Sequence, residues 1–253
     1  MIPLVVVGAA GRMGRAVVQA AREAQGFEIR ARVDRDANQP EVGGVWSDDP
    51  RAVVRAADVV VDFSSPECTR ALAQVCAERG AALVSGTTGL TREDEALLSQ
   101  AAQKVAVLRS ANFSLGVAAL RRALEAALRS LPGGWDIEIV ERHHRQKADS
   151  PSGTALALAD IALAARGLER GALRNGREGR VGARPAEEIG MHAVRGGSWV
   201  GDHAVLLAGT GEWLELRHVA QDRTAFAYGA LAAARFVAGA APGLYTLDHV
   251  LGV

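Results

Sequence analysis

Short apolar runs alternate with helical patterns through the first 108 residues of the chain. A continuous apolar run such as residues 4–7 is typical of a strand that is buried on both faces of a parallel sheet. The successive strands and helices are expected at residues 4–7, 11–24, 28–33, 49–56, 59–63, 66–78, 82–85, 91–103 and 105–108. This alternation predicts an α/β fold in which right-handed crossovers build a doubly wound parallel sheet.

The pattern changes in the second half of the chain. Helices are expected at residues 115–130, 151–166 and 224–241, strands at residues 136–141, 188–194, 203–207 and 213–219, and a Gly- and Arg-rich loop at residues 171–185. The last helix is expected to return to the first domain. We therefore predict a first domain of residues 1–113 and 223–253, and a second, α+β domain of residues 114–222 on a four-stranded open sheet.

A glycine-rich loop, Gly8-Ala9-Ala10-Gly11-Arg12-Met13-Gly14, joins the first predicted strand to the first predicted helix. Glycines at this spacing permit a sharp turn, a close approach to a pyrophosphate and tight packing of helix on sheet, while the helix N-terminus attracts phosphate. Asp34 ends the second strand, where an acid meets the ribose hydroxyls. The loop predicts a Rossmann-like dinucleotide site; the alternative is a glycine-rich turn that binds another ligand.

The pair Asp34-Arg35 bears on the choice of cofactor. A carboxylate at this position favours NADH, whereas a guanidinium can bind the 2′-phosphate of NADPH. Because both groups are present, the sequence is compatible with NADH or NADPH. Arg12, at the start of the helix, is either a further phosphate contact or a solvated surface arginine.

Three small polar segments follow the third, fourth and fifth predicted strands. They are residues 62–65, 86–89 and 110–113. Ligands of open α/β sheets bind beyond the carboxyl ends of the strands, so these segments are candidates for a nicotinamide groove. Each segment alone could equally be an ordinary turn, and only their combination favours the groove.

The densest polar cluster is at residues 141–149 and precedes the helix that opens at residues 150–154. Two histidines and several cations beside a helix N-terminus favour a site for carboxylates, and histidine can exchange a proton near neutral pH. The alternative is a solvated basic loop. Nucleic acid is disfavoured because the formal net charge is +0 and no aromatic residues are interleaved with the cations.

Other classes of function find little support in the sequence. Cys68 and Cys76 are eight residues apart in one predicted helix, too far for a disulfide there, and no metal-ligand spacing surrounds them. The apolar segment 224–241 contains Gly229 and Arg235 and is expected to be a packed helix, not a membrane span. With no charged leader before the first strand, we expect a cytoplasmic protein.

These motifs together resemble the 4-hydroxy-tetrahydrodipicolinate reductase family, also called dihydrodipicolinate reductases. The resemblance extends nearly from end to end, and the block at residues 141–156 is its most specific part. The other segments that carry it are residues 8–15, 86–89, 111–117, 201–203, 211–212 and 243–245. The loop at residues 36–47 is shorter than is usual in the family.

The resemblance implies a role for each matching residue. His143 would be the proton donor or acceptor and Lys147 a second proton donor, while His144, Gly153 and Thr154 would bind the substrate's carboxylates. The cofactor would contact Gly8, Ala9, Ala10, Gly11, Arg12, Met13, Asp34, Arg35, Gly86, Thr87, Thr88, Ser110, Ala111, Asn112 and Phe113.

The resemblance also implies a reaction and an assembly. NADH or NADPH would deliver a hydride to a cyclic dicarboxylate after loss of its 4-hydroxyl as water, in the diaminopimelate route to lysine. Members of the family are similar in forming homotetramers through the sheet of the second domain. The expected partners are therefore this small dicarboxylate and further copies of the chain, with no metal, nucleic acid or membrane.

Two other functions remain to be weighed. One is another two-domain amino-acid oxidoreductase, such as a homoserine or aspartate dehydrogenase, against which the block at residues 143–154 argues. An acylating aldehyde dehydrogenase would need a nucleophilic cysteine at its site, whereas both cysteines lie in a helix of the first domain. The other is a non-enzymatic regulator that senses dinucleotides, which would have no use for a proton donor beside a carboxylate site.

Overall fold

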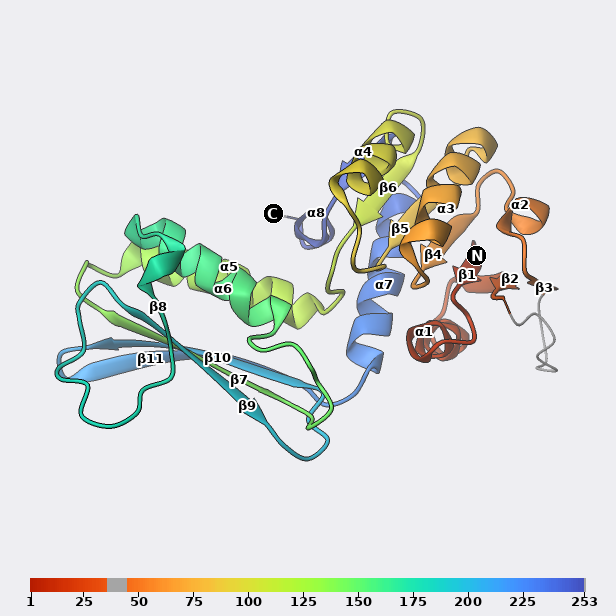
Figure 1. Ribbon diagram of the computed structural model, residues 1–253. Coiled ribbons are helices and arrows are strands. Elements are labelled where there is room, and N and C mark those ends of the chain that lie inside the picture. Colours follow the sequence, from red (N-terminus) through yellow and green to blue (C-terminus); the bar gives the residue numbers. More distant parts are fainter. Residues whose placement is uncertain (36–44, 253) are drawn as a thin grey trace. The chain divides into compact units, whose positions relative to one another are not determined.

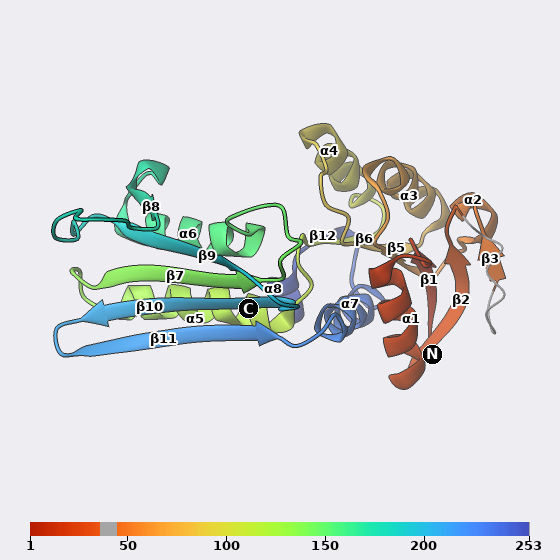
Figure 2. The ribbon, with the colours of Figure 1, turned by 60° about the horizontal axis from the view of Figure 1, so that its bottom comes forward.

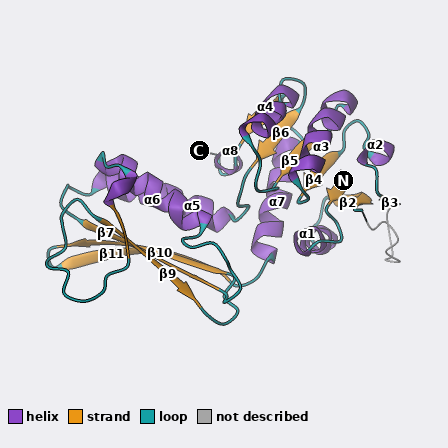
Figure 3. Ribbon diagram, in the orientation of Figure 1, coloured by secondary structure: helices purple, strands orange, loops and turns teal. Residues whose placement is uncertain are grey.

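The computed structural model describes residues 1–35 and 45–252, so most of the loop at residues 36–47 lies outside the described residues. The chain divides into two compact units (Figure 1). Unit 1 comprises Met1–Leu115 and Arg223–Val253, and unit 2 comprises Gly116–Asp222. Each unit has its own sheet and its own helices (Figure 3).

Unit 1 is built on a parallel sheet with the strand order β12-β6-β5-β4-β1-β2-β3. Its strands are β1 (Ile2–Val7), β2 (Phe27–Val33), β3 (Val45–Ser47), β4 (Val59–Asp62), β5 (Ala82–Ser85), β6 (Ala106–Arg109) and β12 (Gly243–Tyr245). The predicted doubly wound sheet is confirmed, and β1 and β4 are the adjacent strands at which the strand order reverses. The edge strands β3 and β12 were not predicted, because three residues are too few to give a periodic signal.

The helices of unit 1 differ at their N-termini, because side chains cap some of them and not others. They are α1 (Arg12–Glu23), α2 (Pro50–Val53), α3 (Pro66–Arg79), α4 (Arg92–Ala101), α7 (Thr224–Val237) and α8 (Leu247–Val250). Ser65 caps α3 with Pro66 in the first turn, and Thr91 forms a capping box with Asp94 at α4. The helix predicted at residues 49–56 is only the single turn α2, because Val54 already has extended backbone angles.

Helix α7 belongs to unit 1 although it follows unit 2 in the sequence. It contacts α1 and the strands β4, β5 and β6 (Figure 2). At Gly229 a Cβ atom would be 1.7 Å from the backbone oxygen of Phe113, so only glycine permits this close packing. The strand β12 then adds to the edge of the sheet beside β6.

Unit 2 contains a mixed sheet with the strand order β11-β10-β7-β9-β8. Its elements are α5 (Leu115–Ser130), β7 (Asp136–His143), α6 (Gly153–Arg166), the short 3₁₀ helix η1 (Arg170–Ala172), β8 (Leu173–Asn175), β9 (Ile189–Arg195), β10 (Gly201–Gly209) and β11 (Glu212–Ala220). The sheet therefore has five strands where four were predicted. The additional strand, β8, lies within the segment that was expected to be a loop. It was not predicted because it has only three residues and pairs at the edge of the sheet.

Alternation along the strands of unit 2 decides which side chains meet its helices. Ile137 and Ile139 of β7 lie in one buried cluster with Leu124 of α5 and Leu158 of α6. Both helices therefore cover the same face of the sheet (Figure 2). The inward-facing series continues along β7 to Glu141 and His143, which are also buried.

Candidate active site

The glycine loop lies at the switch point of the unit 1 sheet, between the ends of β1 and β4. Gly8 directly follows β1 and has a φ angle of 73°. A Cβ atom at Gly8 would be 2.4 Å from the backbone oxygen of Phe63, and one at Gly14 would be 2.1 Å from that of Gly8. Substitution at either glycine would therefore displace the loop, which leaves the backbone open to a ligand at the point where α/β sheets bind them.

The N-terminus of α1 presents backbone groups suited to an anion. Its N-cap, Gly11, provides no side-chain cap, and the first turn contains no acidic residue. The backbone N–H of Ala10 donates to Oδ2 of Asp34 over 2.9 Å, so the loop and the end of β2 are held together. Exposed Arg12 begins the helix and exposed Arg35 follows Asp34. These groups fit the diphosphate and ribose of a dinucleotide.

Segments after β4, β5 and β6 come together, as expected from the sequence. The Phe63 ring takes the space beside Gly86, where a Cβ atom would be 2.1 Å from the ring. The Phe63 and Phe113 rings meet edge to face with their centroids 5.4 Å apart. The Ser110 N–H donates to the Ser85 oxygen over 3.2 Å. Thr87 is buried, whereas Thr88 and Ala111 are exposed and Asn112 is half-buried, so only part of this segment faces solvent.

Asp62 organises these strand ends, a role that sequence reasoning missed. Its fully buried carboxylate accepts hydrogen bonds from the hydroxyls of Thr69, Ser85 and Thr87 over 2.6–3.1 Å. It also accepts the Ser64 N–H over 3.1 Å. One acidic residue thus fixes the segments after β4 and β5 and the first turn of α3. A polar residue at the end of an apolar strand was the available signal.

In unit 2, the buried residues Glu141 and His143 lie on β7, whereas we predicted that His143 follows the strand. That expectation was wrong because the inward alternation of β7 continues for two residues beyond Glu141, with charged side chains in place of apolar ones. Glu141 Oε2 is 2.6 Å from His143 Nδ1. The carboxylate of Glu141 is thus positioned to accept a hydrogen bond from the His143 ring.

Three further groups complete this buried cluster. Arg195 of β9 donates to both oxygens of Glu141 over 2.8 Å each. The backbone N–H of Ser152, which caps α6, donates to Glu141 Oε1 over 3.0 Å. Nε2 of His203, on β10, is 3.0 Å from the Ser152 hydroxyl oxygen. The centroids of the His203 and His143 rings are 5.1 Å apart. Sequence reasoning assigned no role to Glu141, Ser152, Arg195 or His203.

The remaining predicted residues surround the same α6 N-terminus. Lys147 lies in the turn after β7, and its ammonium donates to both oxygens of Asp149 over 2.8 Å. Its backbone N–H donates to the His144 oxygen over 3.1 Å. Gly153 and Thr154 form the first turn of the fourteen-residue helix α6. Cations and the N-terminus of α6 therefore gather in one place, as a site for carboxylates requires.

Burial sets the protonation of the two buried histidines. It lowers the pKa of His143, against the raising effect of the bond to Glu141. Burial and the adjacent His143 ring lower the pKa of His203 to about 4, so His203 is neutral near pH 7. Burial disfavours the charged form of Glu141, but its bonds to Arg195, His143 and Ser152 outweigh burial and lower its pKa. Glu141 is therefore a carboxylate.

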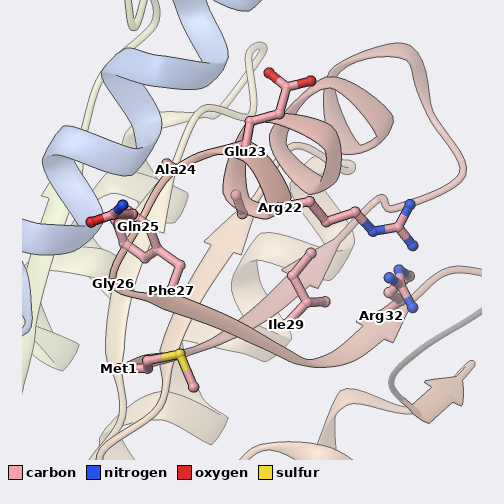
Figure 4. Close-up of a pocket in the computed structure, with 10 residues that line it drawn as sticks. Met1, Arg22, Glu23, Ala24, Gln25, Gly26, Phe27, Ile29 and Arg32 are labelled. Atoms are coloured by element: carbon pink, nitrogen blue, oxygen red, sulfur yellow. The ribbon is translucent and has the colours of Figure 1, made fainter.

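A surface pocket elsewhere in unit 1 contains none of the predicted site residues (Figure 4). It is lined by the last turn of α1, the loop that follows, β2 and the N-terminal Met1, with Arg22 and Phe27 among its lining residues. In residues 1–35 and 45–252, no group of three His, Cys, Asp or Glu side chains could hold a metal ion. Among the helices of the described residues, none is long and apolar enough to cross a membrane.

A doubly wound sheet with a glycine loop at its switch point defines a Rossmann-like protein that binds a dinucleotide. Two family models match the chain: "Dihydrodipicolinate reductase, N-terminus" over residues 2–113 and "Dihydrodipicolinate reductase, C-terminus" over residues 116–251. The chain therefore belongs to the dihydrodipicolinate reductase family, a family of oxidoreductases that use a nicotinamide cofactor.

Curated relatives match over the whole chain. The 4-hydroxy-tetrahydrodipicolinate reductase of Alkalilimnicola ehrlichii is 44% identical, and the match covers 99% of this chain and 98% of the relative. The enzyme of the same name from Anaeromyxobacter sp. is 42% identical, with 100% and 98% covered. The structure of dipicolinate-bound dihydrodipicolinate reductase from Paenisporosarcina sp. TG-14 has the same fold, with a TM-score of 0.80, 24% identity and 97% of each chain covered.

Proposed function

We propose that this chain reduces 4-hydroxy-tetrahydrodipicolinate to tetrahydrodipicolinate, with NADH or NADPH as the reductant, in the diaminopimelate route to L-lysine. Membership of the reductase family over both units carries the proposal. The buried His143 beside the N-terminus of α6 supports it, because a proton donor next to a carboxylate site suits reduction of a dicarboxylate. A regulator without catalysis would need no such donor.

In this proposal, unit 1 holds the cofactor. The loop from Gly8 to Met13 binds the phosphates through backbone N–H groups, with Arg12 as an added charge. Asp34 and Arg35 contact the adenosine ribose and its substituent. The nicotinamide contacts are Gly86, Thr87, Thr88, Ser110, Ala111, Asn112 and Phe113. When bound, the reduced nicotinamide supplies a hydride.

Unit 2 holds the substrate and supplies the protons. His144, Lys147 and the first turn of α6 at Gly153 and Thr154 bind the two carboxylates. His143 exchanges a proton with the ring of the substrate through Nε2, because Nδ1 is hydrogen-bonded to Glu141. Overall, the substrate, the reduced cofactor and one proton would give tetrahydrodipicolinate, the oxidised cofactor and the water formed from the 4-hydroxyl.

A single absorbance assay separates the candidate functions. The intact protein is mixed with NADH and freshly prepared 4-hydroxy-tetrahydrodipicolinate, and the loss of the reduced nicotinamide band is followed. We expect consumption of NADH with this substrate and none with aspartate semialdehyde, which a homoserine dehydrogenase would reduce. Cofactor binding without turnover of any substrate would instead favour a dinucleotide-sensing regulator.

The adjacent Asp34 and Arg35 predict use of both nicotinamide cofactors. Arg35→Ala removes the cation that can pair with a 2′-phosphate, so we expect KM for NADPH to rise about tenfold while KM for NADH changes little. Asp34→Ala removes the ribose contact and should weaken NADH more than NADPH. The ratios of kcat/KM for the two cofactors measure this, and Arg92→Ala, at the start of α4, is the matched control. Equal losses for both cofactors in Arg35→Ala would contradict the assignment.

We also propose that the chain forms a homotetramer through the sheet of unit 2. Along β11, Trp213 and Val219 are 71% and 51% exposed, which is unusual for large apolar side chains on one strand and suits an interface. Sedimentation equilibrium of the intact protein measures the mass of the assembly. A cytoplasmic location, with no nucleic acid or membrane partner, remains a prediction from the sequence.

A further inference from the structure

Glu141 accepts four hydrogen bonds while it is fully buried. Its donors are the Nδ1 of His143, the two terminal nitrogens of Arg195 and the backbone N–H of Ser152. These partners come from β7, β9 and the residue that caps α6. A buried carboxylate with this many donors is held in one position, and its partners are held by it.

The bond to Glu141 determines which nitrogen of His143 carries the proton when the ring is neutral. An ionised carboxylate can only accept hydrogen bonds, so His143 Nδ1 must donate. Nε2 is then the atom left to gain or lose a proton. A Cβ atom at Gly201 would be 3.3 Å from Nε2, so the glycine leaves room on that side of the ring.

Arg195 changes what Glu141 does to the ring. A lone buried carboxylate 2.6 Å from Nδ1 would hold the ring in its protonated form. Here the bidentate Arg195 guanidinium already balances the charge of Glu141. Four charged or titratable groups act on His143: Glu141 on its own strand, Arg195 on β9, His203 on β10 and Lys147 in the turn after β7.

We propose that Glu141 and Arg195 are paired positioning residues: Glu141 fixes the proton on Nδ1 of His143, and Arg195 neutralises Glu141 so that the ring is oriented without being held in its charged form. His143 can then both take up and release a proton at Nε2. Because Glu141 also binds the Ser152 N–H, it holds the proton donor at a fixed position relative to the first turn of α6. The catalytic role of His143 rests on the function proposed above.

Two substitutions should move the His143 pKa in opposite directions. Glu141→Gln removes the carboxylate, so we expect the His143 pKa to fall by about one unit or more. Arg195→Met leaves Glu141 unbalanced and should raise the His143 pKa by a similar amount. A residue that only supported the fold would produce no such opposition. The limb of the kcat–pH profile that His143 sets should move in the same direction as the pKa.

The test follows histidine resonances of the intact protein through a pH titration. The chain has six histidines, so ¹³C and ¹⁵N labels on histidine give few signals, and His143→Gln identifies the one from His143. In the wild type, the ¹⁵N shifts should report the Nδ1–H tautomer. Glu138→Gln is the matched control, because Glu138 also lies on β7 and binds His192 and two arginines, but at the other face of the sheet. It should leave the His143 titration unchanged.

Several results would overturn this inference. It fails if both variants move the His143 pKa in the same direction, if neither moves it, or if the wild type has the Nε2–H tautomer. If Glu141→Gln does not fold, the wild-type tautomer and the Arg195→Met titration still decide. The readout needs no substrate, so opposite shifts in a protein that does not turn over 4-hydroxy-tetrahydrodipicolinate would refute the proposed function and leave the pairing intact.

Discussion

The His143→Gln variant should reduce its substrate about 10²–10⁴-fold more slowly than the wild type, the range expected for loss of an acid–base group. Glutamine can still donate and accept a hydrogen bond at this position, but it cannot exchange a proton near neutral pH. Because the carboxylate contacts are left in place, the loss should appear in kcat more than in KM. Steady-state kinetics with saturating cofactor measure both values.

The same sheet offers a control for this variant. His192 of β9 also binds a glutamate, since its Nε2 lies 2.7 Å from Glu138, but that pair is half-buried and Glu138 lies on the other face of the sheet from Glu141 and His143. His192→Gln should therefore retain turnover within about twofold. Turnover near the wild-type level in His143→Gln, with the fold intact by circular dichroism, would refute the proton-exchange role.

The Lys147→Ala variant should lose a similar amount of turnover, about 10²–10⁴-fold. In the proposed function Lys147 is both a proton donor and a cation beside the carboxylate site, so kcat should fall and KM for the dicarboxylate should rise. In the structure its ammonium donates to both carboxylate oxygens of Asp149, which directs the lysine side chain along the turn after β7. Kinetics at several substrate concentrations separate the two effects.

Lys147→Arg distinguishes charge from proton transfer. Arginine retains the cation but does not release a proton in the accessible pH range, so KM should recover more than kcat does. Lys104→Ala provides the control, because Lys104 is an exposed lysine of unit 1 that contacts none of the proposed site. If Lys147→Arg restored full kcat, Lys147 would be an electrostatic contact and not a proton donor.

The sequence was most informative where its signals are periodic or local. Apolar runs located five of the seven strands in unit 1, and the spacing of Gly8, Gly11 and Gly14 predicted the position of the loop. The bond between the Ala10 N–H and Asp34 joins two segments that the motif had already paired. The edge strands β3, β8 and β12 could not be found in this way, because each has three residues and depends on a neighbouring strand for its pairing.

The buried cluster around His143 could be predicted from the sequence only in part. The histidines and Lys147 stand out in the sequence because they are adjacent, but Arg195 is 54 residues from Glu141 and reaches it only through the parallel pairing of β7 with β9. His203 lies on β10, which pairs with β7 in the antiparallel sense, and it contacts Ser152, the N-cap of α6, across 51 residues. A single sequence does not show which distant strands pair. The burial of Glu141 likewise follows from its position on β7 in the sheet and not from the residues next to it in the sequence.

The late position of α7 and β12 in the chain has a consequence for synthesis on the ribosome. Residues 1–115 of unit 1 precede unit 2 in the chain, yet unit 1 lacks the helices α7 and α8 and an edge strand until the segment Arg223–Val253 has emerged. All the residues of unit 2 are available before that point. The unit whose synthesis starts before that of unit 2 is thus completed after it, and loss of the segment Arg223–Val253 would damage the dinucleotide-binding unit and not unit 2.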